Sequence, residues 1–269
     1  MTERDYGAAA EGGRPSLEIA TQLVGRVSTL LEPWWVLNLY AEAYEASGTL
    51  RPVILWSPGG GRRGQSEYPA RSRAEAARRA GVHLRRYCVA NGLNRLGTLT
   101  YRGDGVFEHG QLREDLGHCF RNLRGLVGRP FPYAWVPEWH PGGHGLHAQF
   151  ALGRYVKVSL IEEAWGCGFV HIKRLGNVPA GQGSVGEARA AARYLAKYVR
   201  KGMDEGREFG RHRFDVAQGY QPEAVQMVGR SEAEVVEQAT EHMGRWPSYL
   251  WRSRDTEEWF GPSAVFCSW

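Results

Sequence analysis

Three side chains in the middle of the chain have the types and spacing to hold a divalent cation. Residues 145–152 alternate with a period of two, so His147 and Gln149 share one face of a predicted strand. Residues 133–138 form a second predicted strand, joined to the first by a turn rich in glycine and proline. A hairpin would bring the carboxylate of Glu138 near His147 and Gln149. Two oxygen ligands and one imidazole favour Mg²⁺ or Mn²⁺ over Zn²⁺ as the cofactor.

The identity of the third ligand stays open at this point. The alternating pattern is also typical of an ordinary half-buried strand that binds nothing. His140, His144 and His171 are rival ligands. We rank His144 first among them, because a mobile turn could swing it inward to replace Gln149.

Two phenols lie one helical turn apart further along the chain. Tyr194 and Tyr198 fall on one shoulder of a predicted helix, and Lys197 lies beside them. Tyrosines placed in this way can simply pack their rings and expose their hydroxyls. Next to a metal site, however, a phenol can attack a phosphodiester whose charge has been neutralised. The metal trio and the tyrosine helix together predict a site that nicks DNA.

The elements around these residues predict the fold that positions them. They follow the order β-α-β-β-α-β, which is typical of an α+β, ferredoxin-like antiparallel sheet with helices on one face. The tyrosine helix is expected to pack against this sheet. The predicted elements are strand 96–101, helix 108–127, strands 133–138 and 145–152, helix 156–165 and strand 168–174.

The composition indicates a basic protein without secretion or membrane signals. The 269 residues carry a formal net charge of +5 with a pI of about 9.1, which suits a polyanionic partner. Four dispersed cysteines without a Cys-x-x-Cys pair argue against a zinc ribbon and a disulfide scaffold. The start of the chain lacks a signal peptide, and no apolar run is long enough to span a membrane. We therefore expect a cytoplasmic protein that does not contact a membrane.

A basic helix is predicted directly before the core. Residues 71–89 carry six arginines and no lysine. Such a run can be a solvated face, but it can also contact phosphates. We name Arg78, Arg79, Arg85 and Arg86 as the candidate DNA-binding residues of this helix.

A glycine-rich loop at 176–184 has the spacing of a phosphate-binding loop that precedes a helix. Gln182 stands where the lysine of such a loop should be, so we expect no nucleotide cofactor.

Three segments of the chain together resemble a known family. They are Thr98-Leu99-Thr100-Tyr101, His147-Ala148-Gln149 and Tyr194-x-x-Lys197-Tyr198. In this order they resemble the three motifs of rolling-circle replication initiators (Rep) in the HUH endonuclease superfamily, of plasmid or phage type. Gln149 departs from the usual second histidine and gives the HUQ form. The resemblance spans about residues 96–201.

The resemblance implies a reaction and a set of partners. Tyr194 would attack single-stranded DNA at an origin and form a 5′-phosphotyrosine, with Lys197 stabilising charge and Tyr198 serving a second transfer. Thr98 and Thr100 of the first motif would contact the DNA. A host polymerase would extend the freed end, and a host helicase would unwind the duplex because no ATPase motif is present.

The resemblance also suggests three parts of the chain. Residues 1–66 would be a disordered tail and a helical extension that includes Trp34, Trp35, Leu37 and Tyr40. Residues 67–215 would be the HUH endonuclease domain with its basic leading helix. Residues 216–269 would form a helical, tryptophan-rich extension, whose aromatic residues either close a domain edge or stack on single-stranded bases.

Two other functions remain open from the sequence alone. A transposase or relaxase would use the same chemistry on a different substrate. A non-catalytic ferredoxin-like module that binds nucleic acid would instead carry aromatic residues on its central strands.

Overall fold

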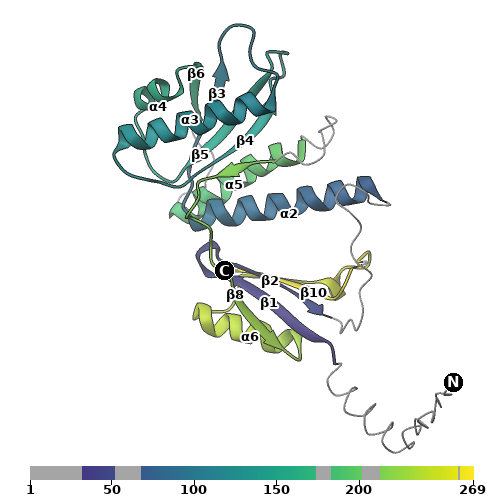
Figure 1. The fold of residues 1–269 in the computed structure, drawn as a ribbon. Coiled ribbons are helices and arrows are strands. Elements are labelled where there is room, and N and C mark those ends of the chain that lie inside the picture. Colours follow the sequence, from purple (N-terminus) through teal and green to yellow (C-terminus); the bar gives the residue numbers. More distant parts are fainter. Residues whose placement is uncertain (1–31, 52–67, 174–182, 202–212, 260) are drawn as a thin grey trace, which may run out of the picture.

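The computed structural model describes residues 32–51, 68–173, 183–201, 213–259 and 261–269. These residues form two five-stranded antiparallel sheets and five α-helices, which confirms the predicted α+β class (Figure 1). Among the described helices, none combines the length and apolar character needed to cross a membrane.

The sheet that carries the predicted site has the strand order β6-β3-β5-β4-β7. Its first four strands and two helices follow the predicted β-α-β-β-α-β sequence, and their order in space is that of a ferredoxin-like sheet. The elements of this unit are α2 (Pro69–Ala90), β3 (Arg95–Tyr101), α3 (His109–Val127), β4 (Tyr133–Trp139), β5 (Leu146–Leu152), α4 (Val158–Trp165), β6 (Gly168–Lys173), α5 (Gly183–Lys201) and β7 (Asp215–Val216).

Helices cover both faces of this sheet, whereas the sequence predicted helices on one face only. α3 and α4 lie on one face, over a core that includes Leu116, Phe120 and Phe150. α2 and α5 cover the opposite face, where Leu84 and Leu195 pack with strand residues of the sheet. The two helices of the ferredoxin-like unit therefore share one face, and the basic helix and the tyrosine helix form the second layer.

The register of the three central strands brings the predicted site residues into two rows. Thr100 pairs with His147, which pairs with Glu138 on the other side. One row along, Thr98 pairs with Gln149. Because neighbouring residues on paired strands point to the same side of a sheet, all five side chains lie on the face covered by α5.

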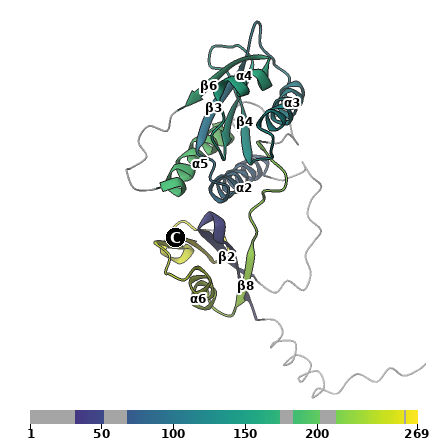
Figure 2. The same ribbon diagram turned by 90° about the vertical axis from the view of Figure 1, so that its left-hand side faces the viewer.

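The second sheet is built from both ends of the described chain, in the order β8-β1-β2-β10-β9. One of its faces packs on α6, and the other faces α2, which lies between the two sheets (Figure 2). The elements of this unit are β1 (Trp34–Tyr40), the 3₁₀ turn Ala41–Ala43, β2 (Glu45–Arg51), β8 (Val225–Gly229), α6 (Glu232–Met243), β9 (Tyr249–Arg252), the 3₁₀ turn Ser253–Asp255 and β10 (Ala264–Ser268).

The helix predicted around Trp34–Tyr40 is wrong, because this segment is strand β1. Trp35, Leu37 and Leu39 are buried at alternating positions and pair with strands from two other parts of the chain. Aromatic and branched residues suit such a pleated surface. The tail and the helix predicted for residues 1–31 lie outside the described residues.

The C-terminal extension is not mainly helical, as predicted, but adds three strands to this second sheet. Its helix α6 is real, and Ser231 caps it by accepting a hydrogen bond from the Glu234 amide at 3.1 Å. Trp269 is buried and donates to the carbonyl of Arg245 at 2.7 Å, so it closes the edge of the unit. Trp246, in contrast, is exposed.

A buried carboxylate holds the second sheet against α2. Glu45 on β2 is 5% exposed and accepts hydrogen bonds from the guanidinium groups of both Arg85 and Arg86. Arg86 also donates to the hydroxyl of Ser47 at 2.9 Å and lies over the ring of Tyr40. These contacts join two units that are far apart in the sequence.

Replacement of Glu45 should therefore destabilise the protein. Glu45→Gln leaves two arginines facing each other without a countercharge. We expect a loss of about 2–3 kcal/mol in the free energy of unfolding, less than for a fully buried pair because Arg85 is 33% exposed. Urea denaturation measures this loss. Glu75→Gln, which removes an exposed pair on the same helix, is the control and should cost less than about 1 kcal/mol. Equal losses in the two variants would contradict a special role for Glu45.

Candidate active site

The three predicted metal ligands meet in one hydrogen-bonded cluster. The carboxylate oxygen Oε2 of Glu138 lies 2.8 Å from Nε2 of His147 and accepts a hydrogen bond from Nε2 of Gln149 at 3.0 Å. The side chains of His147 and Glu138 are only 8% and 9% exposed, and Gln149 is buried as well. Donors from the neighbouring strand thus compensate a carboxylate that is largely removed from water.

The turn between β4 and β5 fixes where His147 falls. Gly145 has a positive φ of 72°, and a Cβ atom at this position would lie 2.4 Å from the carbonyl oxygen of Val106. Leu146 then donates its amide to that same carbonyl. Only glycine fits this close approach, which starts β5 in the register that places His147 opposite Glu138.

Thr98 orients the amide of Gln149. Its Oγ1 donates to Oε1 of Gln149 at 2.9 Å, on the side of the amide away from Glu138. Hydroxyl groups can also accept hydrogen bonds, so Thr98 is compatible with either orientation of the amide. Gln149 could therefore present its oxygen to a cation without losing its partner. The donor set of one carboxylate, one imidazole and one amide fits a hard divalent cation.

No other residue type completes a cation site in the described part of the chain. No group of three His, Cys, Asp or Glu side chains converges there, so the candidate set depends on the amide of Gln149. The ring of His140 lies 5.4 Å from that of His147, whereas exposed His144 contacts the ring of His140. His140 is thus the histidine beside the cluster, although the sequence favoured His144.

Both predicted tyrosines reach this cluster from α5. The hydroxyl of Tyr194 donates to Oε1 of Gln149 at 3.3 Å. Tyr198 donates in turn to the hydroxyl of Tyr194 at 2.8 Å. Tyr194 therefore lies between the cluster and Tyr198, and its oxygen is the phenol oxygen that faces the candidate ligands.

The environment of Tyr198 disfavours its ionised form. Burial is the largest cause that raises the pKa of the Tyr198 phenol, followed by its hydrogen bond to Tyr194 and by the negative charge of Glu138. Tyr198 therefore stays protonated and directs its proton toward the oxygen of Tyr194.

The cation closest to Tyr194 is Lys173, which the sequence did not suggest. Its Nζ lies 3.8 Å from the centre of the Tyr194 ring. The predicted Lys197 is exposed, and its Nζ lies 6.0 Å from the centre of the Tyr198 ring. A period of two along β6 would have placed Lys173 on the face of Thr98 and Thr100, and this signal was available in the sequence.

The four candidate arginines of α2 separate into two pairs. Arg85 and Arg86 are bound to Glu45 between the sheets, so their contacts explain them as packing residues. Arg78 and Arg79 lie on the exposed part of the helix. Arg78 makes two hydrogen bonds to Glu75, which lower the pKa of that carboxyl and raise the pKa of Arg78.

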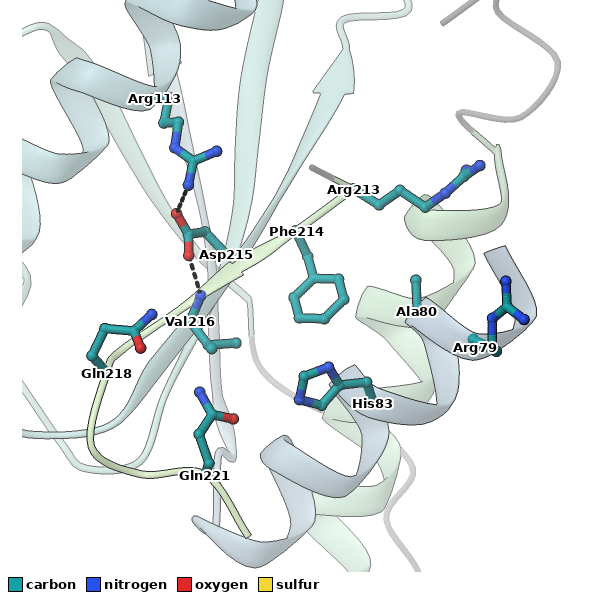
Figure 3. Close-up of a pocket in the computed structure, with 10 residues that line it drawn as sticks. All are labelled: Arg79, Ala80, His83, Arg113, Arg213, Phe214, Asp215, Val216, Gln218 and Gln221. Carbon is teal, nitrogen blue, oxygen red and sulfur yellow. Dashed lines mark hydrogen bonds and ion pairs between the residues drawn. The ribbon is translucent and has the colours of Figure 1, made fainter. Parts of the chain in front are cut away.

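Arg79 lines a pocket of about 470 Å³ between α2 and the segment that carries β7 (Figure 3). Arg79 and Arg213 lie at one end of this pocket and the ion pair of Arg113 with Asp215, 2.9 Å long, at the other. Burial lowers the pKa of Arg213, and its buried Nη1 has no hydrogen-bond partner among the described residues. An unpaired guanidinium donor next to a second arginine suits a bound anion.

Comparison with known proteins gives one match. Residues 94–203, less than half of the 269-residue chain, match the family of the replication-associated protein ORF2 and the gene 2 protein. The matched segment contains β3 to α5 and thus all of the clustered candidate residues. It supports a role as a replication initiator. No curated protein and no solved structure matches the chain.

The environment of Tyr198 predicts a late-titrating phenol. At about pH 11 an ordinary phenol with a pKa near 10 is mostly ionised, but Tyr198 should still be protonated. Folding favours its neutral form, so this contribution to stability is present below about pH 10 and is lost as the pH rises further. Phenolate absorbance of the folded protein should therefore be the same in the wild type and in Tyr198→Phe at this pH.

Tyr194→Phe provides the internal check on that titration. Removing the Tyr194 hydroxyl takes away one cause of the raised pKa, so Tyr198 should then ionise at lower pH. A loss of one phenolate from the wild type upon Tyr198→Phe at about pH 11 would contradict the assignment.

Proposed function

We propose that this protein is a site-specific endonuclease and strand transferase that initiates rolling-circle DNA replication. The proposal depends above all on one observation: the Tyr194 hydroxyl donates to Gln149 within the Glu138–His147–Gln149 cluster. A potential nucleophile and a potential phosphate-binding site are thus in contact. The match of residues 94–203 to a replication-associated family supports the same function.

The proposed reaction is a transesterification. The phenol oxygen of Tyr194 attacks the scissile phosphorus, and the bond from phosphorus to the 3′ oxygen breaks. The products are a 5′-phosphotyrosine and a 3′-hydroxyl, which takes up the proton that the phenol loses. One phosphate ester replaces another, so rejoining the strand requires no ATP.

Glu138, His147 and Gln149 are the residues that would hold the divalent cation. When bound, Mg²⁺ or Mn²⁺ would neutralise the negative charge of the scissile phosphate. Thr98 positions the amide of Gln149 for this purpose, as partners of ligating side chains commonly do. Lys173, which lies over the Tyr194 ring, would favour the negative charge that develops on the attacking oxygen.

Tyr198 has two roles in this proposal. In the first transfer its hydroxyl donates to the Tyr194 oxygen and orients it. In the second transfer, when the displaced strand is closed, Tyr198 is the free phenol next to the cluster. Lys197 is exposed near its ring and would contact the phosphate backbone.

Single-stranded DNA at a replication origin is the proposed substrate. Arg79 and Arg213 would bind its phosphates through the pocket of Figure 3, and Arg78 would add a weaker contact because it is paired with Glu75. α2 and α5 run antiparallel, since Asn94 after α2 binds Glu187 at the start of α5. This pocket and the tyrosines therefore lie toward the same end of the helix pair. A host helicase and polymerase would supply unwinding and extension.

The tyrosine assignment predicts different outcomes for two conservative variants. Single-stranded oligonucleotides that tile the DNA next to the gene are labelled and incubated with the protein and Mn²⁺. Tyr194→Phe should form no covalent adduct on a denaturing gel, because it lacks the attacking oxygen. Tyr198→Phe should still form the adduct, at a rate lowered by the lost hydrogen bond, but should fail in strand closure. Adduct formation by Tyr194→Phe at the wild-type rate would overturn the assignment.

The ligand assignment predicts a cation-dependent gain in stability. At a Mn²⁺ concentration about a hundred times its dissociation constant, the wild type should gain about 2.7 kcal/mol in its free energy of unfolding. Gln149→Leu should fold but lose most of this gain, whereas Gln149→His should keep or increase it. Nicking should stop in EDTA and return with Mn²⁺. His144→Ala is the control and should resemble the wild type; loss of the gain in this variant would show that His144 is the third ligand.

A further inference from the structure

Edge strand β6 places an exposed aromatic ring beside the candidate active site. β6 is the outermost strand next to β3, and Phe169 pairs with Thr100, which pairs with His147. With strands about 4.8 Å apart, the backbone of Phe169 lies about 10 Å from that of His147, in the same row.

Phe169 belongs to the face that carries the cluster. Side chains alternate along β6, so Phe169, His171 and Lys173 share this face, whereas Val170 packs against the core on the other side. Phe169 is 68% exposed, and His171 and Lys173 are exposed as well. The three residues thus form a strip of aromatic, imidazole and ammonium groups, and this strip ends at Tyr194, whose ring Lys173 covers.

The chemistry of this strip matches one class of ligand. An exposed ring next to a cation suits a base that stacks on the ring while its phosphate lies near the positive charge. In a duplex the faces of the bases are already stacked on one another, so only an unpaired strand offers them. The phosphate chain of such a strand would run along β6 toward the Glu138–His147–Gln149 cluster.

We propose that Phe169 is the platform on which a base of the single-stranded DNA substrate stacks, close to the scissile phosphate. This proposal deepens the proposed function, because it identifies how the same site holds its strand. Phe169 contributes binding and positioning and takes no part in the chemical step. His171 flanks the platform, and Lys173 provides the charge between it and Tyr194.

Two probes of equal charge separate stacking from phosphate contacts. A fluorescent oligothymidylate and an abasic oligonucleotide of the same length are titrated into the Tyr194→Phe protein, which cannot cleave them under the proposed function. Phe169→Ala should weaken oligothymidylate binding by about fivefold or more and should leave abasic binding unchanged. Phe169→Trp should retain the affinity for both, and Lys173→Ala should weaken both.

Tyr155→Ala is the matched control. Tyr155 is 70% exposed but follows β5, at the end of that strand away from His147, and its replacement should affect neither probe. Unchanged thermal unfolding of Phe169→Ala establishes that the fold is intact. Wild-type affinity of Phe169→Ala for oligothymidylate, or an equal loss for the abasic probe, would overturn the proposal. Because binding is measured without cleavage, failure of the nicking reaction gives a separate result.

Discussion

The geometry of the site depends on the need of one shielded carboxylate for hydrogen-bond donors. Glu138 is held by His147 and Gln149, and both donors come from the facing strand. A shift of strand pairing by one residue would turn both donors to the face covered by α3 and α4. The strand register therefore determines whether the charge can be buried, and α5 can deliver Tyr194 to the cluster only in that register.

Much of the catalytic sheet could be predicted because its signals are local. Alternation along 145–152 identified a strand with His147 and Gln149 on one face, and a short turn identified its partner strand. The helix spacing of Tyr194 and Tyr198 needed only the geometry of a single helix. What could not be read locally was that the amide of Gln149 is shared between Thr98 and Tyr194, from two separate elements.

The sequence was misleading where partners are remote. Trp34–Tyr40 has apolar residues at both helical and strand spacings, and only its pairing with β2 and β8 decides the matter. The arginines of α2 pose the same problem, since a basic stripe looks alike whether it faces DNA or protein. Glu45, forty residues before Arg85, assigns part of that stripe to the protein interior. Long-range pairing of this kind carries no periodic signal.

The second sheet gives the protein a particular order of assembly. β1 and β2 leave the ribosome first, but the strands that flank them, β8 and β10, are synthesised only after the whole catalytic unit. Until then, Glu45 can meet its arginines while β1 and β2 still have open edges. Once the catalytic unit has folded, β2 and β8 are held near one another, which reduces the entropy lost on closing this long loop. The unit that carries the tyrosines thus acts as an internal folding template for the sheet that encloses it in the sequence.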